Sequence, residues 1–308
     1  MNRRDAMTEE YLSAMERQTG LWGRDGQLRL GEACVAVGGL GGIGSASALM
    51  LAKAGVGLLR VCDRDDYDVP NIVEQEFATH ATIGRSKVDA ALEAMQMHTR
   101  HGAIEGFRAD LSREEECAKL VKGASVLVAA VDNAPARIAL GRAADRAGIP
   151  FVVSANIGWT VIHTTYFPGA YSYKRAWRDP ALKYLEDGYP DMNDAETARA
   201  VATEWDIWVA VFSGFTPAAM RRLLEADPGH YWYAAPPAYF AASLGVGDVC
   251  KIITGTGEPT VFPGCIFFDM LRNRYWEWDS LRTRHEALRR VWAEGAEAVL
   301  AVLDDLRQ

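Results

Sequence analysis

The sequence predicts an α/β protein of the doubly wound class, built around a mixed sheet. Short apolar runs alternate with amphipathic helical stretches from residue 33 to about residue 155, the pattern of a parallel sheet with right-handed crossovers. A glycine-rich turn, GGLGGIGS, joins the first run to the first helix. The run at 158–169 instead alternates with period two and ends in a Pro-Gly turn, which indicates an added antiparallel strand.

The elements of the first half follow from these runs in order. Residues 33–56 predict a strand, the glycine turn and a helix that carries Ala, Leu and Met at helical spacing. Residues 57–66 predict a second strand that ends in acids. The later elements are a helix at 86–98, a strand at 103–111, a helix at 113–123, a strand at 124–133, a helix at 134–148 and a strand at 149–156.

The second half departs from this alternation. Between Tyr171 and Tyr233 the chain is rich in aromatic residues, and we expect a helical insertion there. A later helix is expected to end at Gly255, because glycine is the most common residue just past a helix C-terminus. The elements expected in this half are helices at 194–212, 216–226 and 239–255, a late strand at 261–271 and a C-terminal amphipathic helix at 282–306.

The amino-acid composition argues against several classes of protein function. The 308 residues are 49% hydrophobic and 24% charged, which suits a folded core. A net charge of -8 argues against a nonspecific nucleic-acid binder, which needs clustered Lys and Arg. No apolar run approaches the roughly 20 residues that span a bilayer, and the N-terminus lacks the apolar part of a signal peptide. We therefore expect a cytoplasmic protein with no membrane partner. The five cysteines form no Cys-X-X-Cys pair, so we expect no zinc site.

The glycine turn predicts a site for a nucleotide phosphate. It follows a strand and opens a helix, the context of the nucleotide-binding turn of a Rossmann-like fold. Gly39 allows the tight turn, and Gly44 lets the helix and strand pack closely. Gly41 and Gly42 let the backbone approach a phosphate. The helix N-terminus adds unpaired N–H groups and the positive end of the helix dipole.

Charged side chains follow at the strand ends. Asp63 ends the second strand roughly 20 residues after the loop, where a carboxylate can bind the ribose of NAD as well as of ATP. Asp65 is a second candidate, for which solvation of the strand end is the alternative. Lys87 opens the next helix, and Asp132 ends the fourth strand, where it can hold Mg²⁺. Their joint position at the mouth of one sheet favours a nucleoside triphosphate over a dinucleotide.

Five ordered motifs carry a resemblance to a known family. The opening ERQTGLWGRDGQLRL is followed by GLGGIGS, DRD…VPNIVEQ, GRSK and VDNAPAR at compatible spacings. The chain resembles the E1-like activating enzymes, the superfamily of ThiF, MoeB and HesA, from Glu16 to about Asp269. The segments SLGVGDVCKIITGTGEP and FFD resemble the helix, glycine turn and strand that close that domain.

The resemblance implies an adenylyltransferase, in which a carboxylate attacks the α-phosphate of ATP to give an acyl-adenylate and pyrophosphate. It implies that Asp132 holds Mg²⁺, and that Arg17 reaches the nucleotide of the neighbouring subunit in a homodimer. We expect a helical segment at 1–30 that can contact that subunit, a nucleotide-binding half at 31–165 and a substrate-side half at 166–308. The residues expected to bind ATP are Gly39, Gly41, Gly42, Gly44, Asp63, Asp65, Asn71, Gln75 and Lys87.

The chain departs from the family at Glu74, which stands where the family has an arginine that faces the triphosphate. One charge contact at about 4 Å is worth on the order of 1 kcal/mol in water and about 4 at an effective dielectric of 20. We expect Glu74 to turn outward, or Arg85 or a partner's Arg17 to supply the missing charge. The zinc-binding cysteine pairs and the thioester cysteine of other members are also missing. Direct attack on the adenylate by a nucleophile from the substrate or a partner is therefore expected.

The carboxylate substrate stays open between the C-terminus of a ubiquitin-like carrier, a peptide and a small metabolite. Lys174, Arg175 and Arg178 can meet an acidic tail, although a solvated face is the alternative. Two other functions also stay open. The chain can be a non-catalytic E1-like dimer partner that supplies Arg17 in trans, or an NAD(P)-linked oxidoreductase. Against the oxidoreductase, no catalytic histidine is evident beside the mouth of the sheet.

Overall fold

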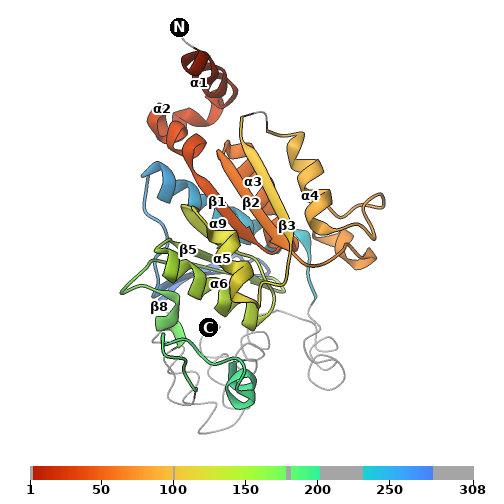
Figure 1. Ribbon diagram of the computed structural model, residues 1–308, viewed down its shortest axis with the longest axis vertical. Helices are drawn as coiled ribbons and strands as arrows, with labels where there is room; N and C mark the ends of the chain where they lie inside the picture. Colours follow the sequence, from red (N-terminus) through yellow and green to blue (C-terminus); the bar gives the residue numbers. More distant parts are fainter. Residues whose placement is uncertain (1–2, 100, 178–181, 202–231, 280–308) are drawn as a thin grey trace.

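The computed structural model describes residues 3–99, 101–177, 182–201 and 232–279 (Figure 1). The helix expected at 216–226, most of the one at 194–212, the C-terminal helix at 282–306 and Arg178 lie outside the described residues.

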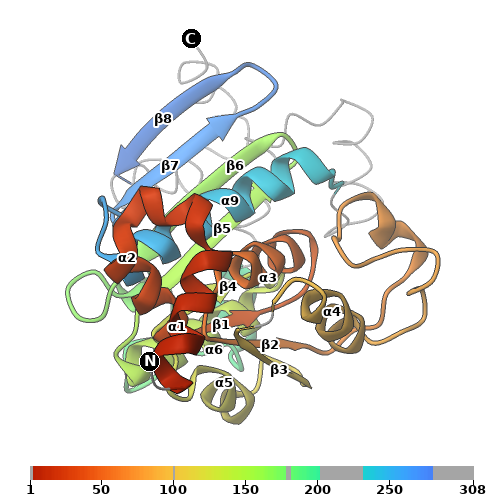
Figure 2. The ribbon, with the colours of Figure 1, turned by 90° about the horizontal axis from the view of Figure 1, so that it is seen from above.

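One eight-stranded mixed sheet forms the centre of the molecule, in the order β3-β2-β1-β4-β5-β6-β7-β8. The first five strands pair in parallel, and β6, β7 and β8 extend the sheet in antiparallel fashion beyond β5 (Figure 2). This confirms the predicted doubly wound mixed sheet. The strands are β1 Cys34–Gly38, β2 Leu58–Asp63, β3 Ala103–Arg108, β4 Val126–Ala129, β5 Phe151–Ile157, β6 Thr160–Tyr166, β7 Gly264–Asp269 and β8 Arg274–Asp279.

Helices cover both faces of the sheet. Helices α3, α4 and α9 pack with one apolar cluster that includes Leu51, Met95 and Val249, and α5 and α6 pack with a second that includes Leu120 and Leu140. The described helices are α1 Arg3–Ala14, α2 Glu16–Glu32, α3 Gly42–Ala54, α4 Lys87–Gln96, α5 Glu114–Val121, α6 Ala134–Ala147 and α9 Ala235–Thr254, with 3-10 turns η1 Val69–Val73 and η2 Tyr173–Trp177.

Local sequence explains where several helices begin and end. The side chain of Ser86 caps α4, and the side chain of Asn133 accepts the N–H of Ala136 to cap α6. Gly148 and the predicted Gly255 end α6 and α9 in the left-handed conformation, which glycine adopts without steric cost. The hairpin that leads into β8 turns at Asn273, which has a φ of 53°. This last strand was not predicted.

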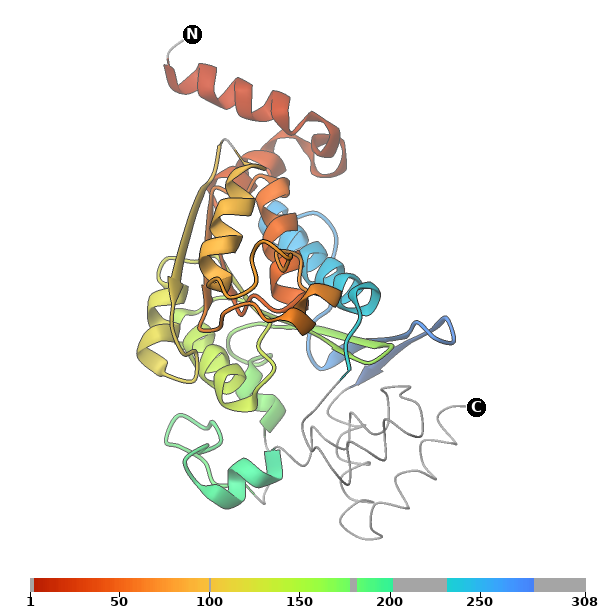
Figure 3. The same cartoon turned by 90° about the vertical axis from the view of Figure 1, so that its right-hand side faces the viewer.

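The strand order creates a crevice at the carboxyl ends of the parallel strands. The chain leaves β1 toward β2 on one side and reaches β4 on the other, so the crossover helices diverge at this point. Open α/β sheets bind ligands at such a switch point. Helices α1 and α2 lie toward the opposite, amino-terminal ends of the strands (Figures 1 and 3). None of the helices in the described part of the chain has the length and apolar character needed to cross a bilayer.

Candidate nucleotide site

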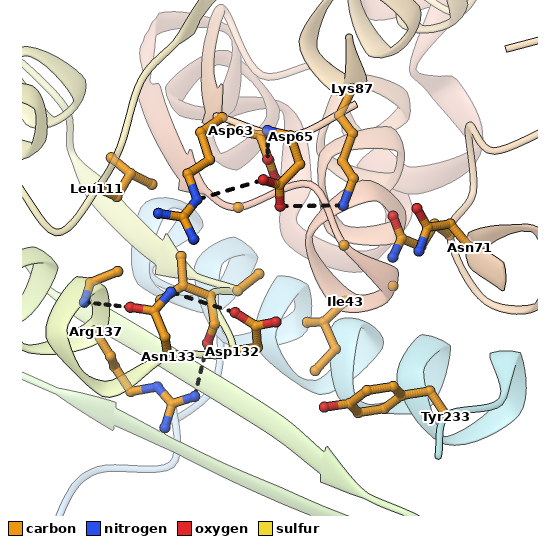
Figure 4. A pocket seen from close by; sticks show the side chains of 18 of the residues that line it. Ile43, Asp63, Asp65, Asn71, Lys87, Leu111, Asp132, Asn133, Arg137 and Tyr233 are labelled. Carbon is orange, nitrogen blue, oxygen red and sulfur yellow. Dashed lines mark hydrogen bonds and ion pairs between the residues drawn. The ribbon is translucent and has the colours of Figure 1, made fainter. Parts of the chain in front are cut away.

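A cavity of about 530 Å³ lies at this switch point (Figure 4). Ligand pockets typically enclose about 300–1,000 Å³, so a nucleotide can enter. The carboxyl ends of β1, β2, β4 and β5 and the N-terminus of α3 contribute to its wall. The predicted nucleotide residues that line it are Gly39, Gly41, Gly42, Asp63, Asp65, Asn71, Gln75, Lys87 and Asp132.

The glycine loop is shaped as the sequence predicts. Gly39 has a φ of 93°, and a Cβ there would come within 2.4 Å of the carbonyl oxygen of Ala130. A Cβ on Gly44 would come within 2.0 Å of the carbonyl oxygen of Gly39, so Gly44 serves packing and does not line the cavity. A Cβ on Gly41 would meet no atom within 4 Å. The loop therefore presents open backbone to the cavity at Gly41.

Asp63 holds this loop in place. Its carboxylate accepts the N–H of Leu40 at 2.6 Å and the N–H of Asp65 at 2.9 Å. Each oxygen of a carboxylate can accept a further hydrogen bond, so a ribose hydroxyl can still bind there. The carboxylate thus ties the glycine loop to the end of β2.

Lys87 is an unusually buried cation at the start of α4. It is only 7% exposed, and its Nζ lies 3.9 Å from Asp65 Oδ2 and 5.8 Å from the centre of the Tyr67 ring. A buried ammonium group is costly unless negative charge surrounds it. Lys87 therefore favours an anion in the cavity, as a phosphate site requires.

Asp132 faces the same opening from the loop between β4 and α6, three residues past the strand end where the sequence placed it (Figure 4). It is exposed, and the side chain of Asn133 lies 3.5 Å away. Arg137 also lines the cavity, and its guanidinium donates to the carbonyl oxygen of Val131 at 2.8 Å. The cavity thus holds a solvated carboxylate opposite a buried lysine.

Glu74 does not turn outward, so that expectation is wrong. It is 8% exposed and lines the cavity, and its carboxylate lies against Gly42 at the start of α3. A Cβ on Gly42 would come within 1.9 Å of Glu74 Oε2. Burial raises the pKa of Glu74, although Gln75, Lys87 and Gly42 act in the opposite direction. The carboxylate occupies the place where the helix N-terminus would receive a phosphate.

Two buried atoms of side-chain amides lack hydrogen-bond partners among the described residues. Gln75 Nε2 donates to Glu74 Oε1 at 2.9 Å, while Gln75 Oε1 has no partner. Asn156 is 8% exposed, and its Nδ2 has no partner. Because an unsatisfied buried polar group costs about 1–3 kcal/mol, both are suited to contacts with a ligand. Asn156 was not predicted, and a lone asparagine at a strand end gives no distinctive sequence signal.

Several predicted charges lie away from the cavity. Arg85 is exposed and pairs with Glu93 at 2.6 Å, so it does not replace the missing arginine within its own subunit. Arg17 is exposed at the start of α2 and does not line this cavity. Lys174 and Arg175 lie in η2, also outside the cavity lining.

The five cysteines are all buried. Burial raises the pKa of Cys62 and Cys117 to about 12, so these thiols stay protonated at neutral pH. The cavity lining contains no cysteine among the described residues. Within the same part of the chain, no group of three or more His, Cys, Asp or Glu is arranged to hold a metal ion by itself.

A glycine loop, a strand-end carboxylate and a buried lysine around the switch point of this mixed sheet define a nucleotide-binding domain of the E1-like class. The chain belongs to the ThiF family, whose model matches residues 15–289.

Curated relatives cover part of the chain. The sulfur carrier protein ThiS adenylyltransferase of Bacillus subtilis is 31% identical over 192 residues, which is 62% of this chain and 54% of that protein. The molybdopterin-synthase adenylyltransferase of Salmonella typhimurium is 33% identical over 153 residues, 49% of this chain and 61% of that protein. The chain thus matches a little over half the length of these relatives.

Solved structures extend the likeness at the level of the fold. The crystal structure of PaaA has a TM-score of 0.64 and 20% identity, and covers 88% of this chain and 73% of PaaA. The structure of Escherichia coli MccB with ATP has a TM-score of 0.64 and 18% identity, and covers 86% of this chain and 70% of MccB. At this identity the likeness concerns the fold alone.

Proposed function

We propose that the protein is an adenylyltransferase, which uses ATP to activate a carboxylate as an acyl-adenylate and releases pyrophosphate. The observation that carries the proposal is the single cavity that brings together the open glycine loop, buried Lys87 and exposed Asp132. The relatives named as adenylyltransferases support the same chemistry.

The roles of the residues follow from their geometry. The loop at Gly41 faces the phosphates with open backbone, Gly42 beside it is covered by the Glu74 carboxylate, and Lys87 neutralises charge on the phosphates. Asp63 accepts from the ribose, while Asn71 and Gln75 contact the nucleotide from η1 and the residues just after it. Asp132 is the ligand that would hold Mg²⁺, which would offset charge on the departing pyrophosphate. The chain's task is positioning and charge neutralisation, so it needs no nucleophile for this first step.

The substrate is the C-terminal carboxylate of a small protein or a peptide. The relative from Bacillus subtilis is named for a sulfur carrier protein, and MccB has been crystallised with the peptide MccA. Asn156 lines the cavity and offers a buried donor for the oxygen atoms of such a carboxylate.

A homodimer is part of the proposal. Arg17 is exposed and does not line the cavity of its own subunit, so we assign it to the nucleotide of a second subunit. The helical segment that carries it projects beyond the sheet (Figure 3).

Pyrophosphate exchange tests the proposal. Purified protein is incubated with ATP, Mg²⁺, labelled pyrophosphate and a set of peptide and carrier-protein C-termini. Carboxylate-dependent label in ATP is expected. Binding of Mg²⁺ and ATP without exchange for any carboxylate would contradict the proposal.

Glu74 favours one second candidate, a non-catalytic partner subunit that supplies Arg17 in trans. A carboxylate at the start of α3 opposes a triphosphate by charge. A protein with no measurable ATP affinity, which gains affinity on Glu74→Arg, would establish this alternative.

A further inference from the structure

Three polar side chains form a continuous hydrogen-bonded chain behind the cavity. Ser154 Oγ lies 2.9 Å from His163 Nδ1, and His163 Nε2 lies 2.9 Å from Asp248 Oδ2. They come from β5, β6 and α9, and His163 and Asp248 are fully buried. A serine, a histidine and an aspartate in this order are the parts of an activated hydroxyl nucleophile.

Asp248 is held as an anion that orients the histidine. Its Oδ2 also accepts from Thr165 Oγ1 at 2.9 Å and from the N–H of Thr260 at 2.8 Å, and Lys251 donates to Oδ1 at 2.9 Å. Burial raises the pKa of Asp248, but these hydrogen bonds and that of His163 outweigh it and lower the pKa overall. Because an ionised carboxylate only accepts, His163 carries its proton on Nε2. Nδ1 is then left to accept the hydroxyl proton of Ser154.

Ser154 lies at the nucleotide cavity. It is 5% exposed, and it lines the cavity together with Ala155 and Asn156. On its other side, a Cβ on Gly245 would come within 2.8 Å of Ser154 Oγ, so α9 approaches the hydroxyl closely. Asn156 Nδ2, buried and without a partner among the described residues, lies two positions along the same strand. A donor at that place can stabilise the oxyanion of an acyl transfer.

We propose that Ser154 accepts the acyl group from the adenylate, in the place of the cysteine that the cavity lacks. Oγ attacks the acyl carbon and forms an ester bond, and the hydroxyl proton moves to His163 Nδ1. The bond between the acyl carbon and the phosphate oxygen breaks, and AMP leaves with the electron pair. Before the second step His163 releases this proton to solvent. An amine or hydroxyl of the acceptor then attacks the ester carbon, its proton passes to His163 Nδ1 and on to Oγ, and the bond between the acyl carbon and Oγ breaks. This inference rests on the proposed function, since the adenylate supplies the acyl group.

A fluorophosphonate probe tests the nucleophile directly, because it phosphonylates activated serines without ATP or substrate. The full-length protein is treated with the probe, and the modified residue is mapped by peptide mass spectrometry. We expect the adduct on Ser154 and its loss in Ser154→Ala. His163→Gln can still donate to Asp248 but cannot take the proton, so it should slow labelling by about 100-fold or more.

Ser172→Ala is the matched control, because Ser172 is also a buried serine but does not line the cavity. Its labelling should equal that of the wild type, and melting curves confirm that each variant is folded. Absence of an adduct on Ser154 in the wild type overturns the inference, whether or not His163→Gln folds. Labelling of a folded His163→Gln at the wild-type rate overturns it as well. Pyrophosphate exchange does not involve the probe, so failure of the proposed function and failure of this inference are distinguishable.

Discussion

Neutralising Glu74 should tighten ATP binding and remove its dependence on pH. The carboxylate lies at the N-terminus of α3, where a phosphate would bind, and burial raises its pKa. A phosphate in this place disfavours the ionised form further. ATP should therefore bind the wild type with uptake of a proton whenever free Glu74 is ionised. Affinity should rise as pH falls toward the pKa of Glu74, by at most tenfold per pH unit for one proton.

The expected gain in ATP affinity follows from the burial of Glu74 and from its distance to a bound phosphate. Glu74 is 8% exposed and touches the helix start, so a bound phosphate comes to about 4 Å or nearer. One charge pair at that distance amounts to about 4 kcal/mol at an effective dielectric of 20 and to about 1 in water. Glu74→Gln should then tighten ATP binding at neutral pH by between roughly fivefold and roughly 1,000-fold. Lys87, which attracts the same carboxylate, moves the result toward the lower figure.

Isothermal titration calorimetry provides the assay. Titrations of ATP and Mg²⁺ in buffers of different ionisation enthalpy give both the affinity and the number of protons taken up. Glu76→Gln is the matched control. Glu76 lies two residues beyond Glu74 in the sequence and carries the same charge, but its side chain does not line the cavity. Equal affinity in Glu74→Gln and the wild type, with no proton uptake in either, would refute the reasoning.

The remaining predictions address the other parts of the site. ATP with Mg²⁺ should raise the melting temperature and NAD⁺ should not, because a ligand at 100 times its Kd stabilises the native state by about 2.7 kcal/mol. Lys87→Ala should weaken ATP binding in calorimetry, whereas Asp132→Asn, at an exposed position, should keep the melting temperature but abolish pyrophosphate exchange. Arg17→Ala should reduce exchange without changing the melting temperature, and unchanged exchange would remove Arg17 from the site. Elemental analysis should find less than one equivalent of zinc, and a full equivalent would contradict the sequence prediction.

The pH dependence of the stability of the protein without nucleotide tests the raised pKa of Glu74 independently. A carboxyl group whose pKa is raised in the folded state binds protons more tightly there than in the unfolded state. Stability is therefore lost as pH rises from the unfolded value of 4.5 through the folded pKa. Glu74→Gln should stabilise the free protein at neutral pH, and this advantage should vanish below the unfolded value. Melting curves across that range check the sign.

Much of the fold could be predicted because its signals are local. Apolar runs, amphipathic stretches and the glycine turn are each contained in one short segment, and the carboxyl ends of parallel strands necessarily share one edge. This is why Lys87 and Asp132 could be assigned to one cavity from the sequence. The strand β8 was not predicted from the sequence, because its pairing with β7 depends on a turn at Asn273. No glycine or proline stands beside Asn273 to signal that turn.

The chain of Ser154, His163 and Asp248 could not be predicted in the same way. His163 and Asp248 are 85 residues apart and meet only because α9 packs across β5 and β6. No spacing in the sequence reports such a meeting. The prediction that Glu74 turns outward was wrong for a different reason. The charge of a side chain can be read from the sequence, but the positive potential of a helix start in the folded protein decides whether a carboxylate points inward.

The inward position of Glu74 can be understood from the positive groups around the cavity. Lys87 is buried, and its ion-pair partner Asp65 is 3.9 Å away and exposed. The N-terminus of α3 adds positive potential to the same cavity. Glu74 supplies negative charge to both, since its carboxylate lies against Gly42 and is attracted by Lys87. A phosphate would take over this role on binding, so the carboxylate must then accept a proton or move. One residue thus offsets the positive charge of Lys87 and the helix start, at a cost set by the burial of its own charge, and it makes nucleotide binding depend on pH.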